Sequence, residues 1–141
     1  MAMNEMDPAA ALAQAQQLKT SVDRRSHWVV RYQLAYGTVS FAMVLTLGLL
    51  RGPLGVGLSM GLWMSAILVL SVYAARQPVA HRGMAATHGV MIGVWAVLYG
   101  IVLGFGVAFF RGELVWWLPG AVLVALPGFG AAWVTARRVR A

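Results

Sequence analysis

The chain contains no cysteine and has few acidic residues. Among its 141 residues, Asp and Glu number 4 and charged residues make up 11%, whereas a soluble domain carries about a quarter charged residues. The missing cysteine excludes a disulfide-built secreted domain, thiol catalysis, Cys-ligated zinc and iron–sulfur clusters. Hydrophobic residues make up 60% of the chain, which excludes a disordered protein. A chain this short also cannot bury so much apolar surface away from water, which excludes a soluble domain. The composition predicts a membrane protein.

Four long apolar stretches are candidates for membrane-spanning helices. They are residues 28–50, 53–73, 87–110 and 114–135, each close to or above the length of about 20 residues that a bilayer core requires. Backbone polar groups in lipid must be satisfied internally, so each stretch is expected to be helical. Glycine-containing links at 51–53 and 111–113 are short enough to force antiparallel hairpins. We predict an all-α fold with a four-helix transmembrane bundle over residues 28–135.

Lysine and arginine are unequally divided between the two ends of the predicted bundle. Only Arg51 and Arg111 lie at one end. Nine lie at the end with both termini, the middle loop and the basic tail 136–141: Lys19, Arg24, Arg25, Arg31, Arg76, Arg82, Arg137, Arg138 and Arg140. Because Lys and Arg are enriched in cytoplasmic loops, both termini are expected in the cytoplasm. The same placement, at the ends of apolar runs, argues against direct binding of nucleic acid despite a net charge of +7.

Residues 1–27 differ from the rest and predict a cytoplasmic amphipathic helix. Asp7-Pro8 supplies an N-cap and a proline at the first helical position, and an Ala- and Gln-rich run follows. Three roles are open for it: a solvated lead-in helix, a surface that docks a protein, or contact with lipid head groups. The candidate partner-binding residues are those of its apolar face, its basic end and the middle loop: Ala11, Ala15, Leu18, Val22, Arg24, Arg25, Arg76 and Arg82.

Small residues recur at helical spacing in three of the spans, which lets helix backbones approach each other in lipid. The residues predicted for helix packing are Gly57, Gly61, Gly89, Gly93, Gly100 and Gly104, and the fourth span adds Ala121, Ala125, Gly128 and Ala132. We expect these faces to form the seams of the bundle or of a dimer. Pro127 is expected to kink the fourth span, because it removes one backbone hydrogen bond.

Two tryptophans, Trp63 and Trp95, fall in the middle of their spans, away from the membrane interfaces that tryptophan prefers. They either pack or face lipid, or they line a pocket for an apolar or cationic ligand. Tyr32, Tyr36 and Ser40 form a polar stripe in the first span, which fits a shallow pocket or hydrogen bonds between helices. The candidate ligand pocket therefore comprises Tyr32, Tyr36, Trp63 and Trp95.

Chemistry-bearing motifs are missing from the sequence. No Asp or Glu lies within a predicted span, which weakens the case for a proton-coupled transporter. His27, His81 and His88 follow no established metal-binding spacing, and Ser59, Ser65 and Ser71 have no His or Lys partner in sequence. We therefore expect no enzyme activity, no metal and no cofactor.

The layout of this chain resembles a group of small four-span membrane proteins from high-GC actinobacteria. The resemblance rests on the Asp7-Pro8 helix, Trp28 at the start of the first span, the four spans and the preference for Arg over Lys. Some members are encoded beside winged-helix regulators. The resemblance implies the cytoplasmic membrane of a bacterium and transfers no functional residue. We expect a non-enzymatic membrane sensor or anchor that holds a cytoplasmic protein, such as a transcription regulator, and responds to a hydrophobic ligand. The alternative is a small transporter or channel component that works as a homo-oligomer, or an accessory subunit of a membrane complex.

Overall fold

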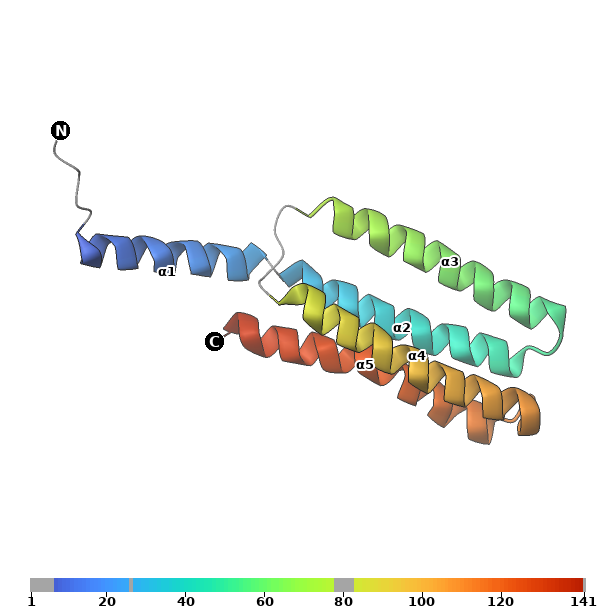
Figure 1. Cartoon of the computed structure of the whole chain (residues 1–141). Helices are drawn as coiled ribbons and strands as arrows, with labels where there is room; N and C mark the ends of the chain where they lie inside the picture. The colour runs from blue at the N-terminus through green and yellow to red at the C-terminus, as the bar shows by residue number, and fades with distance from the viewer. Residues whose placement is uncertain (1–6, 26, 78–82, 141) are drawn as a thin grey trace.

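The chain folds into α-helices throughout the part described by the computed structural model, residues 7–25, 27–77 and 83–140, without the side chains at 19, 22–25 and 139–140. The helices are α1 (Pro8–Arg25), α2 (His27–Leu49), α3 (Pro53–Ala75), α4 (Met84–Phe109) and α5 (Leu114–Arg140) (Figure 1). Helices α2 to α5 are long and apolar enough to cross a membrane. The predicted fold, four candidate spans preceded by a short helix, is confirmed. The third span begins earlier than predicted, and α5 continues beyond residue 135.

Three glycines with a left-handed backbone mark the ends of helices. Gly52 has φ 79° and lies between α2 and α3, and Gly112 has φ 77° and lies between α4 and α5. Gly83, with φ 93°, directly precedes α4. Because positive φ costs glycine nothing and other residues much more, these positions fix where each helix stops or starts. The two short links join α2 to α3 and α4 to α5 as antiparallel hairpins.

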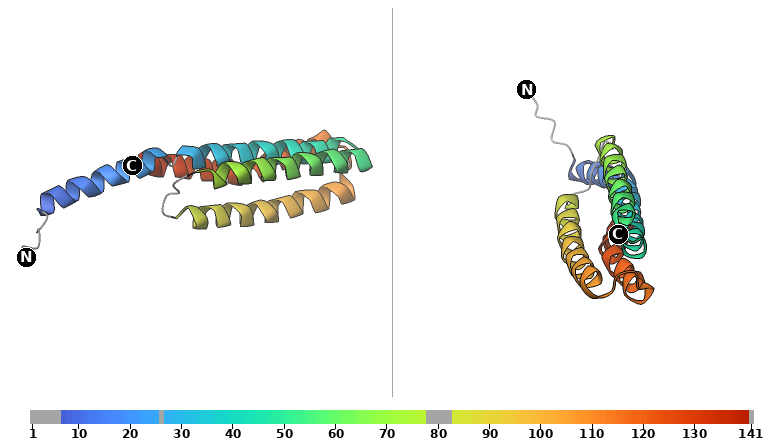
Figure 2. Two further views of the ribbon diagram at one scale, coloured as in Figure 1. Left: turned by 90° about the horizontal axis from the view of Figure 1, so that it is seen from above. Right: turned by 90° about the vertical axis from the view of Figure 1, so that its right-hand side faces the viewer.

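The two hairpins meet through α2 and α5. Helix α2 packs against α3 and α5, and α5 packs against α4. Helices α3 and α4 lie on the outside, and the backbones of their described residues do not come together (Figure 2). Helix α1 and the C-terminus lie at one end of the bundle, which we call the terminal end (Figure 1). The opposite end, with both short links, is the turn end.

The contact between α2 and α5 depends on small residues. A Cβ atom on Gly128 would lie 2.8 Å from both the Cα and the N atom of Gly37, so the two backbones touch. Nearer the turn end, a Cβ on Gly48 would overlap the buried ring of Trp117. The stripe noted in the fourth span is buried along α5: Ala121, Ala125, Gly128 and Ala132. This seam forms the centre of the bundle.

The glycines of α3 and α4 that were predicted for helix packing do not contact another helix within the chain. A Cβ atom added at Gly57, Gly61, Gly89, Gly93, Gly100 or Gly104 would meet no atom within 4 Å. A stripe of small residues shows that another helix can approach closely, but it does not specify which helix. Inside this chain, the close backbone approach is between α2 and α5. A role of these α3 and α4 glycines in a dimer stays a prediction.

Helix α5 continues through Pro119 and Pro127. Pro127 has no N–H to donate to the carbonyl of Leu123, four residues earlier, so that carbonyl lacks its usual helical partner.

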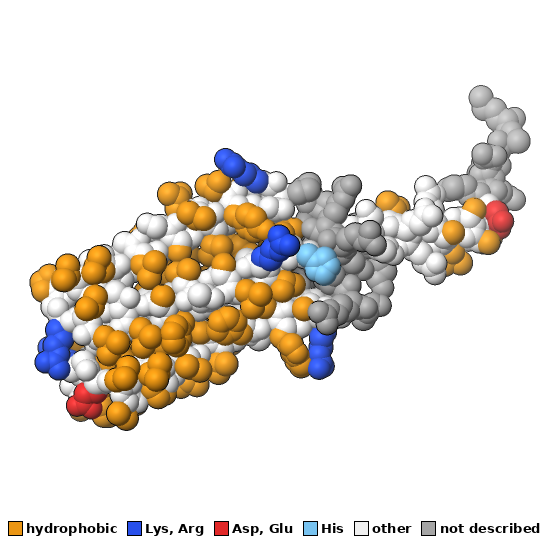
Figure 3. Space-filling view, turned by 180° about the vertical axis from the view of Figure 1, so that it is seen from behind, with side chains coloured by type: hydrophobic (Ala, Val, Ile, Leu, Met, Phe, Trp, Pro, Cys, Tyr) orange, Lys and Arg blue, Asp and Glu red, His pale blue; other side chains and the backbone are white. Residues whose placement is uncertain are grey.

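The outer surface of the bundle matches a lipid environment. Hydrophobic side chains cover its length, and Lys, Arg and His side chains lie toward its two ends (Figure 3). Large apolar residues such as Leu68, Val97 and Phe109 are mostly exposed. Exposed apolar surface of this extent is unfavourable in water but matches the hydrocarbon core of a bilayer.

Candidate functional site

Three of the four predicted ligand-pocket residues come together in the middle of the bundle. The rings of Trp63 on α3 and Trp95 on α4 stack in parallel with centroids 4.9 Å apart. The Tyr36 ring of α2 meets both edge-on, at 5.3 Å from Trp63 and 5.9 Å from Trp95. Tyr32 lies one turn away, with its ring against His88 at 5.5 Å. We call Tyr36, Trp63, Trp95 and Tyr99 the aromatic cluster.

Hydrogen bonds fix the aromatic cluster to α2. The Nε1–H of Trp95 donates to Ser40 Oγ at 3.0 Å, and the Ser40 hydroxyl donates to the Tyr36 carbonyl at 2.8 Å. On the other side, the Tyr99 ring stacks on Trp95 at 5.1 Å. The rings of the aromatic cluster thus pack against one another and occupy the space between α3 and α4. The polar stripe of the first span therefore makes a helix-to-helix hydrogen bond, and neither of the two cavities described below is lined by the cluster.

A cavity of about 510 Å³ lies between α4 and α5 toward the terminal end. Val90, Met91 and Val94 line it from α4, and Pro127 and Val134 are among the residues that line it from α5. Its volume and apolar walls fit a small hydrophobic ligand. In the sequence analysis, only Pro127 among the lining residues was singled out. The cavity forms where α4 and α5 separate, and no residue pattern predicts that separation. We call it the α4–α5 cavity.

Two buried oxygen atoms near the terminal end lack a hydrogen-bond partner among the described residues. They are Gln33 Oε1 on α2 and Thr135 Oγ1 on α5. A buried polar group without a partner costs about 1–3 kcal/mol. Buried polar atoms are therefore less well satisfied there than in the middle of the bundle, where Ser40 has partners on α2 and α4.

The predicted partner-binding residues lie mainly at the terminal end. Ala15 and Leu18 are exposed on α1, and Ala11 is half-buried. Arg76 is exposed directly after α3. The side chains of Val22, Arg24 and Arg25 are not described, and Arg82 lies outside the described residues.

The histidines do not form a metal site in the described part of the chain. His27 is exposed, His88 packs against Tyr32, and His81 lies outside the described residues. Within the described ranges no three His, Cys, Asp or Glu residues come together. The serine hydroxyls also serve structure: Ser59 donates to the Val56 carbonyl within α3.

Function has to be inferred from these features of the chain itself. No protein-family model matches the chain, and comparison with curated proteins and with solved structures gives no match either.

Proposed function

We propose that this protein is a non-enzymatic membrane anchor and sensor, which holds a soluble cytoplasmic protein through α1. The observation that carries the proposal is the position of α1, which extends away from the bundle at the terminal end (Figures 1 and 2). Its apolar face remains largely uncovered, because Ala15 is exposed and Leu18 is 62% exposed. A helix of this kind suits the docking mode in which an amphipathic helix lies in an apolar groove of a partner.

Charge at the terminal end indicates what the partner surface carries. Arg31, Arg76, Arg137 and Arg138 are exposed there. Positive charge at an interface favours a partner with acidic residues around the groove and speeds the encounter. A transcription regulator of the winged-helix class, which the resemblance implies, is one partner of this kind.

Leu18→Glu is expected to reduce the amount of soluble partner retained on purified membranes at least tenfold. A carboxylate on the docking face would be buried without a partner, which is strongly unfavourable. Deletion of residues 1–26 is expected to abolish retention while leaving the four spans folded. The measurement is affinity purification of the tagged chain from its native membranes, followed by mass spectrometry.

Ala13→Glu is the matched control, because Ala13 is exposed on the opposite side of α1. Retention of the same soluble protein by the Ala13→Glu and Leu18→Glu chains alike would contradict the proposal. A membrane protein recovered in fixed ratio would instead indicate an accessory subunit.

The α4–α5 cavity provides a route by which a ligand could change this anchoring. It lies in the half of the bundle next to α1, and Arg138 at the terminal end is among its lining residues. A ligand shifts an equilibrium only if it binds one state more tightly than the other. A hydrophobic molecule between α4 and α5 would favour the separated arrangement of these helices.

Gly130→Phe is expected to exclude such a ligand. Gly130 lines the α4–α5 cavity, and a Cβ there would meet no atom within 4 Å, so the new ring can occupy the cavity without distorting α5. The measurement is solvent extraction of the purified protein, followed by mass spectrometry of small molecules. A hydrophobic compound should accompany the native chain and the control Gly89→Phe, which also faces open space, and be absent from Gly130→Phe. Equal recovery from all three would assign the compound to bulk lipid.

A further inference from the structure

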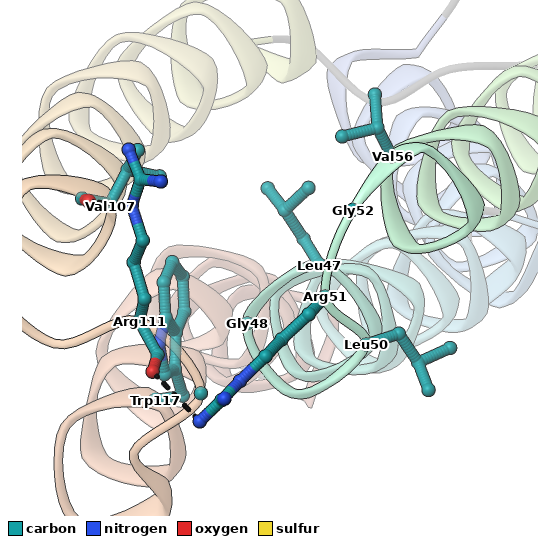
Figure 4. A pocket seen from close by; sticks show the side chains of 10 residues that line it. Leu47, Gly48, Leu50, Arg51, Gly52, Val56, Val107, Arg111 and Trp117 are labelled. Carbon is teal, nitrogen blue, oxygen red and sulfur yellow. Dashed lines mark hydrogen bonds between the residues drawn. The ribbon is translucent and has the colours of Figure 1, made fainter.

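A second cavity, of about 470 Å³, lies at the turn end between the two hairpins. Leu47 of α2, Val56 of α3 and Val107 of α4 form apolar walls, and Trp117 of α5 is among the lining residues. Figure 4 shows Val56 and Val107 on opposite sides of the cavity, with the Arg51 side chain reaching the Arg111 backbone and the Arg111 side chain extending toward Val107. Among the residues that the structure describes, Arg51 and Arg111 are the only Lys or Arg residues at the turn end of the bundle. We call this cavity the two-arginine pocket.

The two guanidinium groups are held by backbone carbonyls. Arg51 Nη2 donates to the Arg111 carbonyl at 3.4 Å, and Arg111 Nε donates to the Val107 carbonyl at 2.7 Å. Gly112 permits this arrangement, because a Cβ atom there would lie 2.5 Å from Arg51 Nε. Each guanidinium has five N–H donors, so most of them remain available to a ligand.

Neither guanidinium has a carboxylate partner among the described residues. Glu113 is the nearest acidic residue in sequence, yet it forms no ion pair with Arg51 or Arg111. Trp117, which also lines the pocket, has no N–H left for a ligand, because its Nε1–H already donates to the Phe110 carbonyl at 2.7 Å. The pocket therefore presents unpaired positive charge above an apolar interior.

We propose that the two-arginine pocket binds the phosphate of an anionic amphiphile, such as a phospholipid with a net negative charge. Arginine forms paired hydrogen bonds to phosphate oxygens, and the walls of leucine and valine match a hydrocarbon chain. Helices α3 and α4 do not pack backbone to backbone, so an acyl chain enters from the bilayer between Val56 and Val107. This site is independent of the soluble partner proposed for α1.

Binding is tested on the purified full chain in a non-ionic detergent, by native mass spectrometry. The probes are dihexanoyl phosphatidylglycerol, dihexanoyl phosphatidylcholine and inorganic phosphate. We expect phosphatidylglycerol to bind at least tenfold more tightly than either of the others. Inorganic phosphate binding as tightly as phosphatidylglycerol would assign the site to free phosphate and overturn the role of the apolar walls. Phosphatidylcholine binding equally would overturn the role of the charge.

Variants separate this pocket from general attraction of lipid to basic residues. Arg51→Gln and Arg111→Gln are each expected to weaken phosphatidylglycerol binding about tenfold, whereas Arg76→Gln at the terminal end should leave it unchanged. Val56→Trp fills the pocket and keeps both arginines, so it should weaken binding too. Val115→Trp, at an exposed position outside the pocket, is its control. Equal binding by all these chains, with unchanged helix content by circular dichroism, would overturn the proposal.

Discussion

Trp95→Ala is expected to lower the free energy of unfolding by about 3 kcal/mol, the lower end of the range for truncating a core tryptophan, because Trp95 is half-buried. Trp95 stacks between Trp63 and Tyr99 and donates to Ser40 Oγ. Since the backbones of α3 and α4 do not meet, these rings are the main link between the two outer helices. The measurement is unfolding in mixed micelles with increasing SDS, followed by circular dichroism.

Trp133→Ala is the control for the loss of a tryptophan. Its ring is 57% exposed, and its described partner is Arg137, whose guanidinium carbon lies 3.7 Å from the ring centroid. A cation–π contact at an exposed site contributes about 0.5–1 kcal/mol, so the control should cost no more than that. Ser40→Ala should cost about 1–3 kcal/mol, because it leaves the Trp95 Nε1–H without its acceptor. Equal losses for Trp95→Ala and Trp133→Ala would show that the aromatic cluster does not hold α3 to α4.

Gly128→Ala is expected to destabilise the bundle by about 1–3 kcal/mol, the cost of overpacking a close contact. The new methyl group would lie 2.8 Å from backbone atoms of Gly37 and 3.0 Å from the Gln33 carbonyl oxygen. Backbone atoms cannot rotate away as a side chain does, so α2 and α5 must separate. The same titration with SDS measures the loss.

Gly93→Ala is the matched control for Gly128→Ala. Gly93 is also a helical glycine, but a Cβ there would meet nothing within 4 Å. Alanine is favoured over glycine in a helix by about 1 kcal/mol, so this variant should be unchanged or slightly more stable. A larger loss for Gly93→Ala than for Gly128→Ala would refute the assignment of the central seam to α2 and α5. If Gly93 instead lies in a dimer seam, Gly93→Leu would change the oligomeric state in cross-linking and leave the monomer folded.

The spans and turns could be predicted from the sequence because each depends on local properties. Long uncharged runs can satisfy their backbone polar groups in lipid only as helices, and glycine permits the positive φ at residues 52 and 112. The small-residue stripe at Ala125 and Gly128 was also placed in a seam, and it lies against α2. These inferences needed no knowledge of which helix is beside which.

The partners of each helix could not be predicted in the same way. The stripes of α3 and α4 follow the steps of four that sequence patterns reveal, yet they face open space within the chain. On α2 the close contacts use Gly37 and Gly48, which are eleven residues apart and therefore on one face after three turns. Large residues, such as Met43, fill the interval between them. An eleven-residue spacing of single glycines is the signal that would have identified this face.

The candidate site was predicted in part. Mid-span tryptophans indicated that Trp63 and Trp95 have a role away from the interfaces, and the structure stacks them on each other. Whether they would line a cavity or fill one depends on the separation of α3 and α4, which is a property of the whole bundle. Both cavities arise from such separations and lie elsewhere.

The pairing of α2 with α5 has a consequence for biosynthesis. Helix α2, the first of the four spans, forms the central seam with α5, the fourth. Every residue between these two helices must therefore be synthesised before that seam can form. Contacts between segments so distant in sequence form slowly. Until α5 emerges from the ribosome, the buried face of α2 around Gly37 and Gly48 has no α5 to cover it. A chain that stops before α5 would keep three apolar helices but would have lost the surface around which they assemble.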